Sequence, residues 1–237
     1  MIEYVINLDG DVFLWLNSFH NLFWDVFMKI ATGRIIWGFF YLAIIIALFR
    51  AYGWKTALLM ILFSCVAVAC ADQITASLLR PYFERLRPAH IENPISEFVH
   101  IVDGYRGGRF GFPSSHAANT FAAAVFLSLV FKRWRFTIAI FIWAILNCYS
   151  RIYLGVHYPG DLLAGIIIGS ILGLICFFIA NFINNGFRGF HKIGQSDPLL
   201  KAYIGGVKFY YRAPDIAILV EFLTILGIFI FVVSLFY

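Results

Sequence analysis

The sequence predicts an all-α membrane protein that crosses the bilayer several times, because it is unusually apolar, poor in charge and rich in aromatic residues. Of its 237 residues, 62% are hydrophobic and 13% are charged, against roughly 45–50% and about 25% in soluble globular domains. Mean hydropathy is +0.84, and Phe alone occurs 27 times. A soluble fold of this size leaves about a third of its unfolded surface in water. Soluble enzymes, disordered tails and nucleic-acid-binding domains are therefore excluded as primary interpretations.

Six apolar stretches are expected to span the membrane, each near the roughly 20 residues that a spanning helix needs. An amphipathic segment precedes them at 11–32, where aromatic residues alternate with Asp, Asn, His and Lys, and we expect it to lie as one helix in the interface. The first span is short and is expected to extend back towards residue 29. The predicted spans are 35–49, 54–79, 114–131, 136–156, 162–187 and 216–237.

The distribution of basic residues predicts how the chain is oriented. With six spans, the loops after the first, third and fifth spans share one face, and this face carries more Lys and Arg than the other. Because such an excess is typical of cytoplasmic loops, both termini and the loop 80–113 are expected to face outward. The net charge of +5 is thus explained by the membrane rather than by nucleic acid.

Three polar segments interrupt the apolar pattern, and the span count brings all three to one face. Arg80 and Arg87 are seven residues apart, which on a helix would place them two turns apart on one side. His116 opens the third span, where the free N–H groups of a helix N-terminus attract anions. Asp161 follows His157 by four residues across a Pro-Gly turn, so it can hold one imidazole nitrogen and leave the other free to attack.

Each segment taken alone has a simpler interpretation. Single arginines at helix ends also snorkel to the interface, and Pro113 and Ser114 are ordinary residues for a helix start. Together, however, the segments supply arginine forks that match phosphate oxygens and two histidines, one for a nucleophile and one for a general acid. No carboxylate cluster suited to Mg²⁺ accompanies them. The pattern predicts phosphoryl transfer that needs no metal and no cofactor.

These segments resemble the three motifs of the type 2 phosphatidic acid phosphatase family, written KxxxxxxRP, PSGH and SRxxxxxHxxxD. Two positions depart from the family: Arg80 stands in place of Lys and Ser115 in place of Gly, and neither removes a chemical role. The family includes integral membrane lipid phosphatases and soluble vanadium haloperoxidases with the same anion pocket. The matching residues are Arg80-x6-Arg87-Pro88, Pro113-Ser114-Ser115-His116 and Ser150-Arg151-x5-His157-x3-Asp161.

The resemblance implies a role for each matching residue. His157 is expected to attack phosphorus and form a phosphohistidine, Asp161 to orient His157, and His116 to protonate the leaving oxygen. The phosphoryl oxygens are expected to bind Arg80, Arg87, Ser114, Ser115 and Arg151.

Two further polar residues are expected to support the pocket from behind. Asp72 lies about two turns before Arg80, so it pairs either with an arginine of the pocket or with a polar group on a neighbouring helix. Asn119 follows His116 by three residues and is expected to face the site.

The sequence therefore predicts a lipid phosphatase of a bacterial inner membrane, with its site facing the periplasm or the cell exterior. Candidate substrates within the family are undecaprenyl diphosphate, phosphatidylglycerol phosphate, phosphatidic acid and the phosphates of lipid A. The alternatives are a transporter or channel with an intramembrane ion path and a haloperoxidase-like oxidase. We expect a single membrane domain over 1–237, comprising the interfacial helix 11–32, the active-site loop 80–113, the catalytic core 72–185, and the basic cytoplasmic loop with the last span, 188–237.

Overall fold

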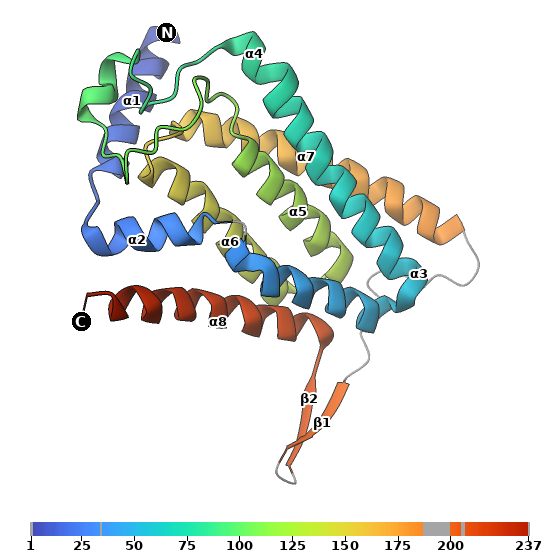
Figure 1. The fold of residues 1–237 in the computed structure, drawn as a ribbon. Coiled ribbons are helices and arrows are strands. Elements are labelled where there is room, and N and C mark those ends of the chain that lie inside the picture. Colours follow the sequence, from blue (N-terminus) through green and yellow to red (C-terminus); the bar gives the residue numbers. More distant parts are fainter. Residues whose placement is uncertain (1, 34, 187–199, 205–206, 237) are drawn as a thin grey trace.

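The computed structural model describes residues 2–33, 35–186, 200–204 and 207–236. These residues are helical except for one antiparallel hairpin and the connecting segments (Figure 1). The helices are α1 (Ile2–Asn17), α2 (Leu22–Ala31), α3 (Gly38–Asp72), α4 (Arg80–Phe83), α5 (Ser115–Phe131), α6 (Trp134–Tyr153), α7 (Pro159–Gly186) and α8 (Ala213–Ser234), and the strands are β1 (Leu200–Ile204) and β2 (Val207–Tyr211).

Several of these helices are suited to a bilayer, which confirms the prediction of a largely helical protein with apolar helices. In the part of the chain that the structure describes, four helical stretches are long and apolar enough to cross a membrane. Large apolar side chains point outward along them; Phe178 and Phe182 of α7 are 62% and 80% exposed. The four stretches are Ile35–Phe83, Trp134–Tyr153, Pro159–Gly186 and Ala213–Ser234, and α5 is apolar but shorter.

The longest stretch is divided at Gly53. This residue has a φ of 71° inside α3, a backbone conformation that glycine adopts without the steric cost of a Cβ. The two arms of α3 diverge from this point (Figure 1). They correspond to the predicted spans 35–49 and 54–79, and the second arm continues through a π-helical segment, Gln73–Leu79, into α4.

The prediction of one interfacial helix over 11–32 is wrong. The chain instead forms α1 and α2, separated by residues 18–21. The Ser18 hydroxyl donates to the carbonyl of Trp15, and Asn21 caps α2 by accepting from the backbone N–H of Trp24. Short polar side chains that bond to nearby backbone compete with a continuous helix, so the break falls at these residues.

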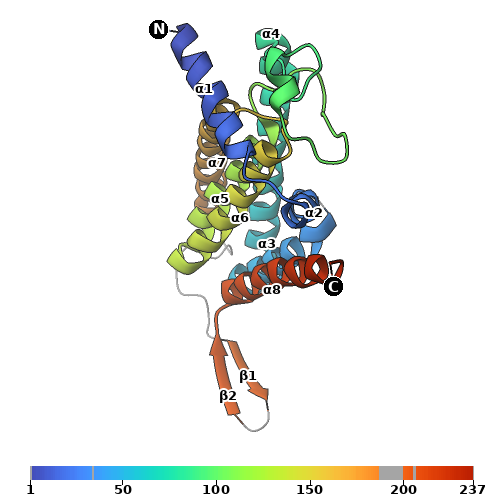
Figure 2. The ribbon, with the colours of Figure 1, turned by 90° about the vertical axis from the view of Figure 1, so that its left-hand side faces the viewer.

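The basic loop expected between the predicted spans 162–187 and 216–237 is described only in part. Within it, β1 and β2 pair in antiparallel register from Leu200 with Tyr211 to Ile204 with Val207. The hairpin projects from one side of the molecule, whereas α1, α4 and the segment 84–114 gather at the opposite end (Figures 1 and 2).

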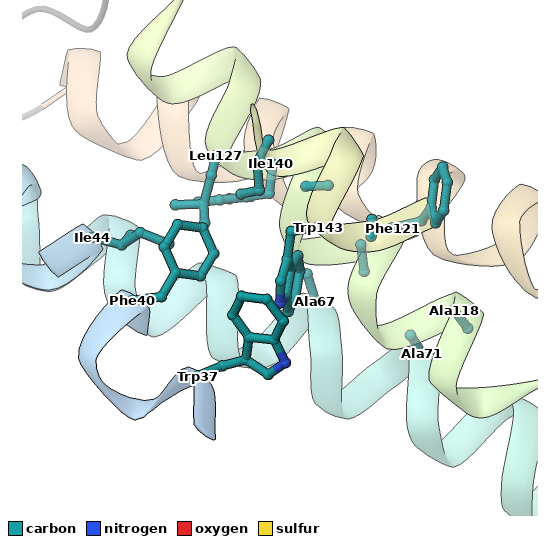
Figure 3. Packing of buried hydrophobic residues seen from close by; sticks show 14 of the residues in the cluster. Trp37, Phe40, Ile44, Ala67, Ala71, Ala118, Phe121, Leu127, Ile140 and Trp143 are labelled. Atoms are coloured by element: carbon teal, nitrogen blue, oxygen red, sulfur yellow. The ribbon is translucent and has the colours of Figure 1, made fainter. Parts of the chain in front are cut away.

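A core of large side chains joins α3, α5 and α6 (Figure 3). Trp143 of α6 lies 6.3 Å from Trp37 and 5.8 Å from Phe40, measured between ring centroids. Leu127 and Ile140 belong to the same buried cluster. This packing fixes the three helices whose ends carry the polar segments.

Close packing of α5 against α7 sets the position of the third polar segment. A Cβ on Gly165 would lie 2.4 Å from the carbonyl oxygen of Ser114, the residue that caps α5. A Cβ on Gly169 or Gly173 would lie 2.1 or 2.6 Å from a carbonyl oxygen within α5. Small residues at every fourth position let two membrane helices approach closely. The backbone N–H of Ser114 also donates to the carbonyl of Asp161 at 3.0 Å, so the starts of α5 and α7 are directly joined.

Candidate active site

His157 lies in the turn between α6 and α7 and is 1% exposed. Its Nδ1 lies 3.4 Å from Oδ2 of Asp161, and the same oxygen accepts from the backbone N–H of Tyr158 at 3.0 Å. The Nδ1 contact is long, as catalytic hydrogen bonds often are without substrate. Asp161 is fully buried in the first turn of α7, where it fixes the plane of the imidazole.

The other imidazole nitrogen faces Arg87. Its Nε2 lies 3.5 Å from Nη1 of Arg87. Because a guanidinium can only donate, this geometry assigns the lone pair to Nε2 and the proton to Nδ1, which then donates to Asp161. The nitrogen that carries the lone pair is therefore the one that faces the cationic pocket.

Three guanidinium groups converge beside His157. Arg80 donates to Oγ of Ser115 at 2.7 Å, Arg87 donates to the carbonyl of Phe110 at 3.1 Å, and Arg151 donates to Oγ1 of Thr32 at 2.9 Å. Among the described residues, none of the three lies within ion-pair distance of a carboxylate, and Nε of Arg80 and Nε of Arg151 are buried without a hydrogen-bond partner. Buried donors of this kind are expected to bind an anion.

Burial and nearby charges determine the protonation states of His157 and Arg87, which face each other. Burial, and then the charges of Arg87, Arg151 and Arg80, hold the pKa of His157 well below its usual 6.5, although the backbone of Gly111 opposes this shift. Burial and the neighbouring guanidinium groups also lower the pKa of Arg87 to about 10. At neutral pH the imidazole is thus neutral while the arginine remains charged.

The N-terminus of α5 supplies the third part of the site. Ser114 is fully buried, and its Oγ caps the helix by accepting from the backbone N–H of Ala117 at 3.4 Å. The Ser115 hydroxyl accepts from Arg80 and also from Oγ1 of Thr75 at 2.9 Å. Ser115 therefore faces the pocket, whereas Ser114 serves the helix.

A cavity of about 800 Å³ joins most of the residues expected in the site. Ser114 and Asp161 lie behind its wall, and Asp161 contacts His157, which lines the cavity. The cavity continues from the charged end between α3, α5 and α6 into the apolar core. The predicted site residues that line it are Asp72, Arg80, Arg87, Ser115, His116, Asn119, Arg151 and His157.

The expected helical spacing of Arg80 and Arg87 is wrong. The helix ends at Phe83, and Glu84 adopts a left-handed conformation with a φ of 47°. Arg87 instead follows an extended segment in which Leu86 bridges Phe110. The two arginines reach the same cavity because the chain turns back after α4.

Asp72 hydrogen-bonds to a neighbouring helix, and no arginine of the described residues lies within ion-pair distance of it. Nδ2 of Asn119 on α5 donates to Oδ1 of Asp72 at 3.0 Å. The sequence left open whether Asp72 pairs with an arginine of the pocket or with a polar group on a neighbouring helix, and its hydrogen-bond partner is the polar group on α5. The pair lies one turn of α5 below His116, on the cavity wall.

Sequence reasoning missed a set of residues behind His157. Arg85 donates from Nη1 to Oδ1 of Asp161 at 2.9 Å and from Nη2 to Oδ2 of Asp9 at 2.7 Å, and its guanidinium lies 4.0 Å from the ring centroid of Tyr158. Asp9, on α1, also accepts from the backbone N–H of Gly160 at 2.8 Å. The sequence did offer one indication, because Asp9 is a carboxylate in an otherwise apolar stretch. Its partners could not be identified, however, because they are remote in sequence.

Comparisons with known proteins agree with this geometry. The family profile described as the PAP2 superfamily matches residues 57–184. A lipid A 4'-phosphatase of Bacteroides thetaiotaomicron is 42% identical over 234 residues, which cover 98% of each chain. A lipid A 4'-phosphatase of Porphyromonas gingivalis is 34% identical over 172 residues, covering 73% of this chain and 72% of the relative.

A solved structure shares the fold. The crystal structure of Aquifex aeolicus LpxE aligns with a TM-score of 0.54 and 24% identity, covering 72% of this chain and 95% of that one. The family profile and the nearly full-length relative together show that the chain belongs to the PAP2 superfamily.

Proposed function

We propose that this protein is a membrane lipid phosphatase that removes the 4'-phosphate from lipid A. The observation that carries the proposal is the 42% identity to a lipid A 4'-phosphatase across 98% of both chains. The cationic cavity beside His157 supplies the chemistry, and its continuation into the apolar core suits a substrate with acyl chains.

In the first step, Nε2 of His157 attacks phosphorus. A bond forms between Nε2 and phosphorus while the bond from phosphorus to the sugar oxygen breaks, and His116 gives its proton to that oxygen. Asp161 stabilises the positive charge that develops on the imidazole, because it accepts the hydrogen bond from Nδ1. The guanidinium groups of Arg80, Arg87 and Arg151 stabilise the charge on the phosphoryl oxygens.

In the second step, water attacks the phosphohistidine. His116, now neutral, takes a proton from the water, and the bond from phosphorus to Nε2 breaks to release inorganic phosphate. The same histidine thus acts as acid and then as base. Ser115 and the N-terminus of α5 contribute further donors to the phosphoryl oxygens.

The protein is a multi-pass membrane protein, and we propose that it crosses the bilayer six times with the site-bearing end outside the cytoplasm. The two arms of α3 supply two spans, and α5, α6, α7 and α8 supply four. The basic residues of 188–212 support a cytoplasmic location for the opposite end. In a bacterial inner membrane this orientation places the site at the periplasmic face, with residues 1–237 forming one membrane domain.

Phosphate release from lipid A by purified protein tests the proposal. The protein in detergent is incubated with lipid A that carries both phosphates, and the products are separated by mass spectrometry with fragmentation. We expect loss of the 4'-phosphate alone and no reaction with the His157→Ala variant. Loss of the 1-phosphate, or reaction with undecaprenyl diphosphate but not lipid A, would contradict the assignment.

A further inference from the structure

The cavity passes a band of polar side chains before it becomes apolar. Along α5, His116 is followed by Asn119 one turn deeper and by Leu127 at the apolar end, and all three line the cavity. At about 1.5 Å per residue, the path from His116 to Leu127 is roughly 16 Å long. The wall formed by α6 changes in the same way. From its charged end it presents Arg151, then the amide of Asn147, and then the aliphatic side chain of Ile140.

The pair of Asp72 and Asn119 lines this cavity and contains an unpaired acceptor. Nδ2 of Asn119 donates to Asp72, so Oδ1 of the same amide is directed elsewhere. That oxygen is buried and has no partner in the described part of the chain. Because buried polar atoms are nearly always paired, and an acidic residue at membrane depth is a functional candidate, the pair points to a polar group of a ligand.

Trp143 supplies a second, independent observation on another helix. Its side chain is 4% exposed and lines the same cavity, packed against Trp37 and Phe40 (Figure 3). Its Nε1 has no hydrogen-bond partner among the described residues. The residues that line the cavity therefore include one with an unpaired donor on α6 and one with an unpaired acceptor on α5.

We propose that Asp72, Asn119 and Trp143 form a subsite for the hydroxyl and amide groups of an acylated amino sugar. This proposal rests on the proposed function and deepens it, because it names the groups that the enzyme recognises besides phosphate. An acylated amino sugar carries O–H and N–H donors and a carbonyl acceptor next to its phosphate, and its acyl chains continue into the apolar end. A polyprenyl diphosphate has only hydrocarbon at this depth and leaves Oδ1 of Asn119 and Nε1 of Trp143 unpaired.

A comparison of two substrates tests the subsite. We would measure kcat/KM for lipid A and for undecaprenyl diphosphate in the same mixed micelles, with wild type, Asn119→Leu and Trp143→Phe. A site built to bond a polar group discriminates strongly against substrates that lack it, and one lost hydrogen bond corresponds to about tenfold. We expect each variant to lower the ratio of lipid A to undecaprenyl diphosphate by about tenfold, through loss on lipid A.

Asn184→Leu is the matched control. Asn184 of α7 is buried and accepts from Oγ1 of Thr56 on α3 at 3.1 Å, so it also joins two helices, but it lies outside the cavity. Its variant should leave the ratio unchanged. Trp143→Phe keeps the aromatic packing and provides the test if Asn119→Leu does not fold.

The outcomes separate the subsite from the proposed function. If wild type hydrolyses lipid A but both variants lower the two rates by one common factor, the subsite is wrong and the function stands. If wild type releases no phosphate from lipid A, both proposals are overturned.

Discussion

Arg85 binds the oxygen of Asp161 that His157 does not use. Its Nη1 donates to Oδ1 at 2.9 Å, while Oδ2 faces Nδ1 of His157 at 3.4 Å. Through Nη2, the same guanidinium binds Asp9 of α1. The orientation of the proposed nucleophile therefore depends on a residue from the helix at the start of the chain.

Replacing Arg85 with Gln should lower kcat on the order of tenfold to a hundredfold, since small displacements of reacting groups have effects of this size. Steady-state kinetics with lipid A would measure the loss. Arg109→Gln is the control, because Arg109 pairs with Glu92 in an exposed ion pair and should retain full activity.

Arg85→Gln in an Asp161→Asn background shows whether Arg85 acts by positioning Asp161 or only by stabilising the fold. If Arg85 acts through Asp161, the second substitution should remove little further activity, because the two residues belong to one network. Independent, multiplicative losses would show that Arg85 acts by another route.

Gly111 approaches the site so closely that a methyl group should disturb it. A Cβ at this position would lie 3.1 Å from Oδ2 of Asp161 and 3.5 Å from Nδ1 of His157. We expect Gly111→Ala to lower kcat by about tenfold or more, measured as phosphate release. Gly108→Ala in the same segment meets no atom within 4 Å and should behave as wild type; equal activity of the two variants would contradict the geometry.

The packing of α5 against α7 should be sensitive to one methyl group. In Gly169→Ala the new Cβ would lie 2.1 Å from the carbonyl oxygen of Ala118, and overpacking of this kind destabilises by roughly 1–3 kcal/mol. The Tm of the purified protein in detergent should fall accordingly. Gly186→Ala, on the same helix but with nothing within 4 Å, should leave Tm unchanged.

Replacing Arg87 should shift the acid limb of the pH profile of kcat/KM. As the proposed nucleophile, His157 can attack only when its imidazole is neutral. Burial and the neighbouring guanidinium charges hold its pKa well below 6.5, so we expect activity to be retained at pH 6.5 and lost at lower pH. Removing a nearby positive charge favours the imidazolium and raises the pKa of His157. Arg87→Gln should therefore move the acid limb to higher pH, and Arg87→Lys should move it less.

Both variants must be measured on one lipid. The second ionisation of a phosphate monoester, with a pKa of about 6, contributes equally to every profile and cancels in the comparison. An acid limb that does not move in Arg87→Gln would show that it belongs to the substrate.

Much of the architecture follows from local sequence patterns. Apolar runs near spanning length predict helices close to α5, α6 and α7, and the spacing of His157 and Asp161 places both in one turn, where the structure has them in contact. The separation of α1 from α2 depended on weaker local signals from Ser18 and Asn21.

Contacts between remote segments could not be predicted in the same way. Asp9 and Arg85 are 76 residues apart, as are Arg85 and Asp161, and no periodicity relates them. Their meeting depends on how α1 packs across the turn between α6 and α7. The meeting of Arg80 and Arg87 likewise depends on the chain reversal after Phe83 rather than on helical spacing.

Detection of the phosphorylated residue during turnover tests the central claim most directly. The enzyme would be mixed with lipid A, quenched in alkali within the first turnover, because phosphohistidine survives base and not acid, and analysed by peptide mass spectrometry. We predict phosphate on His157 alone, appearing before free phosphate and absent from His157→Ala. Release of phosphate with no phosphorylated peptide at any time, or phosphate on His116, would contradict the assignment of His157 as the nucleophile.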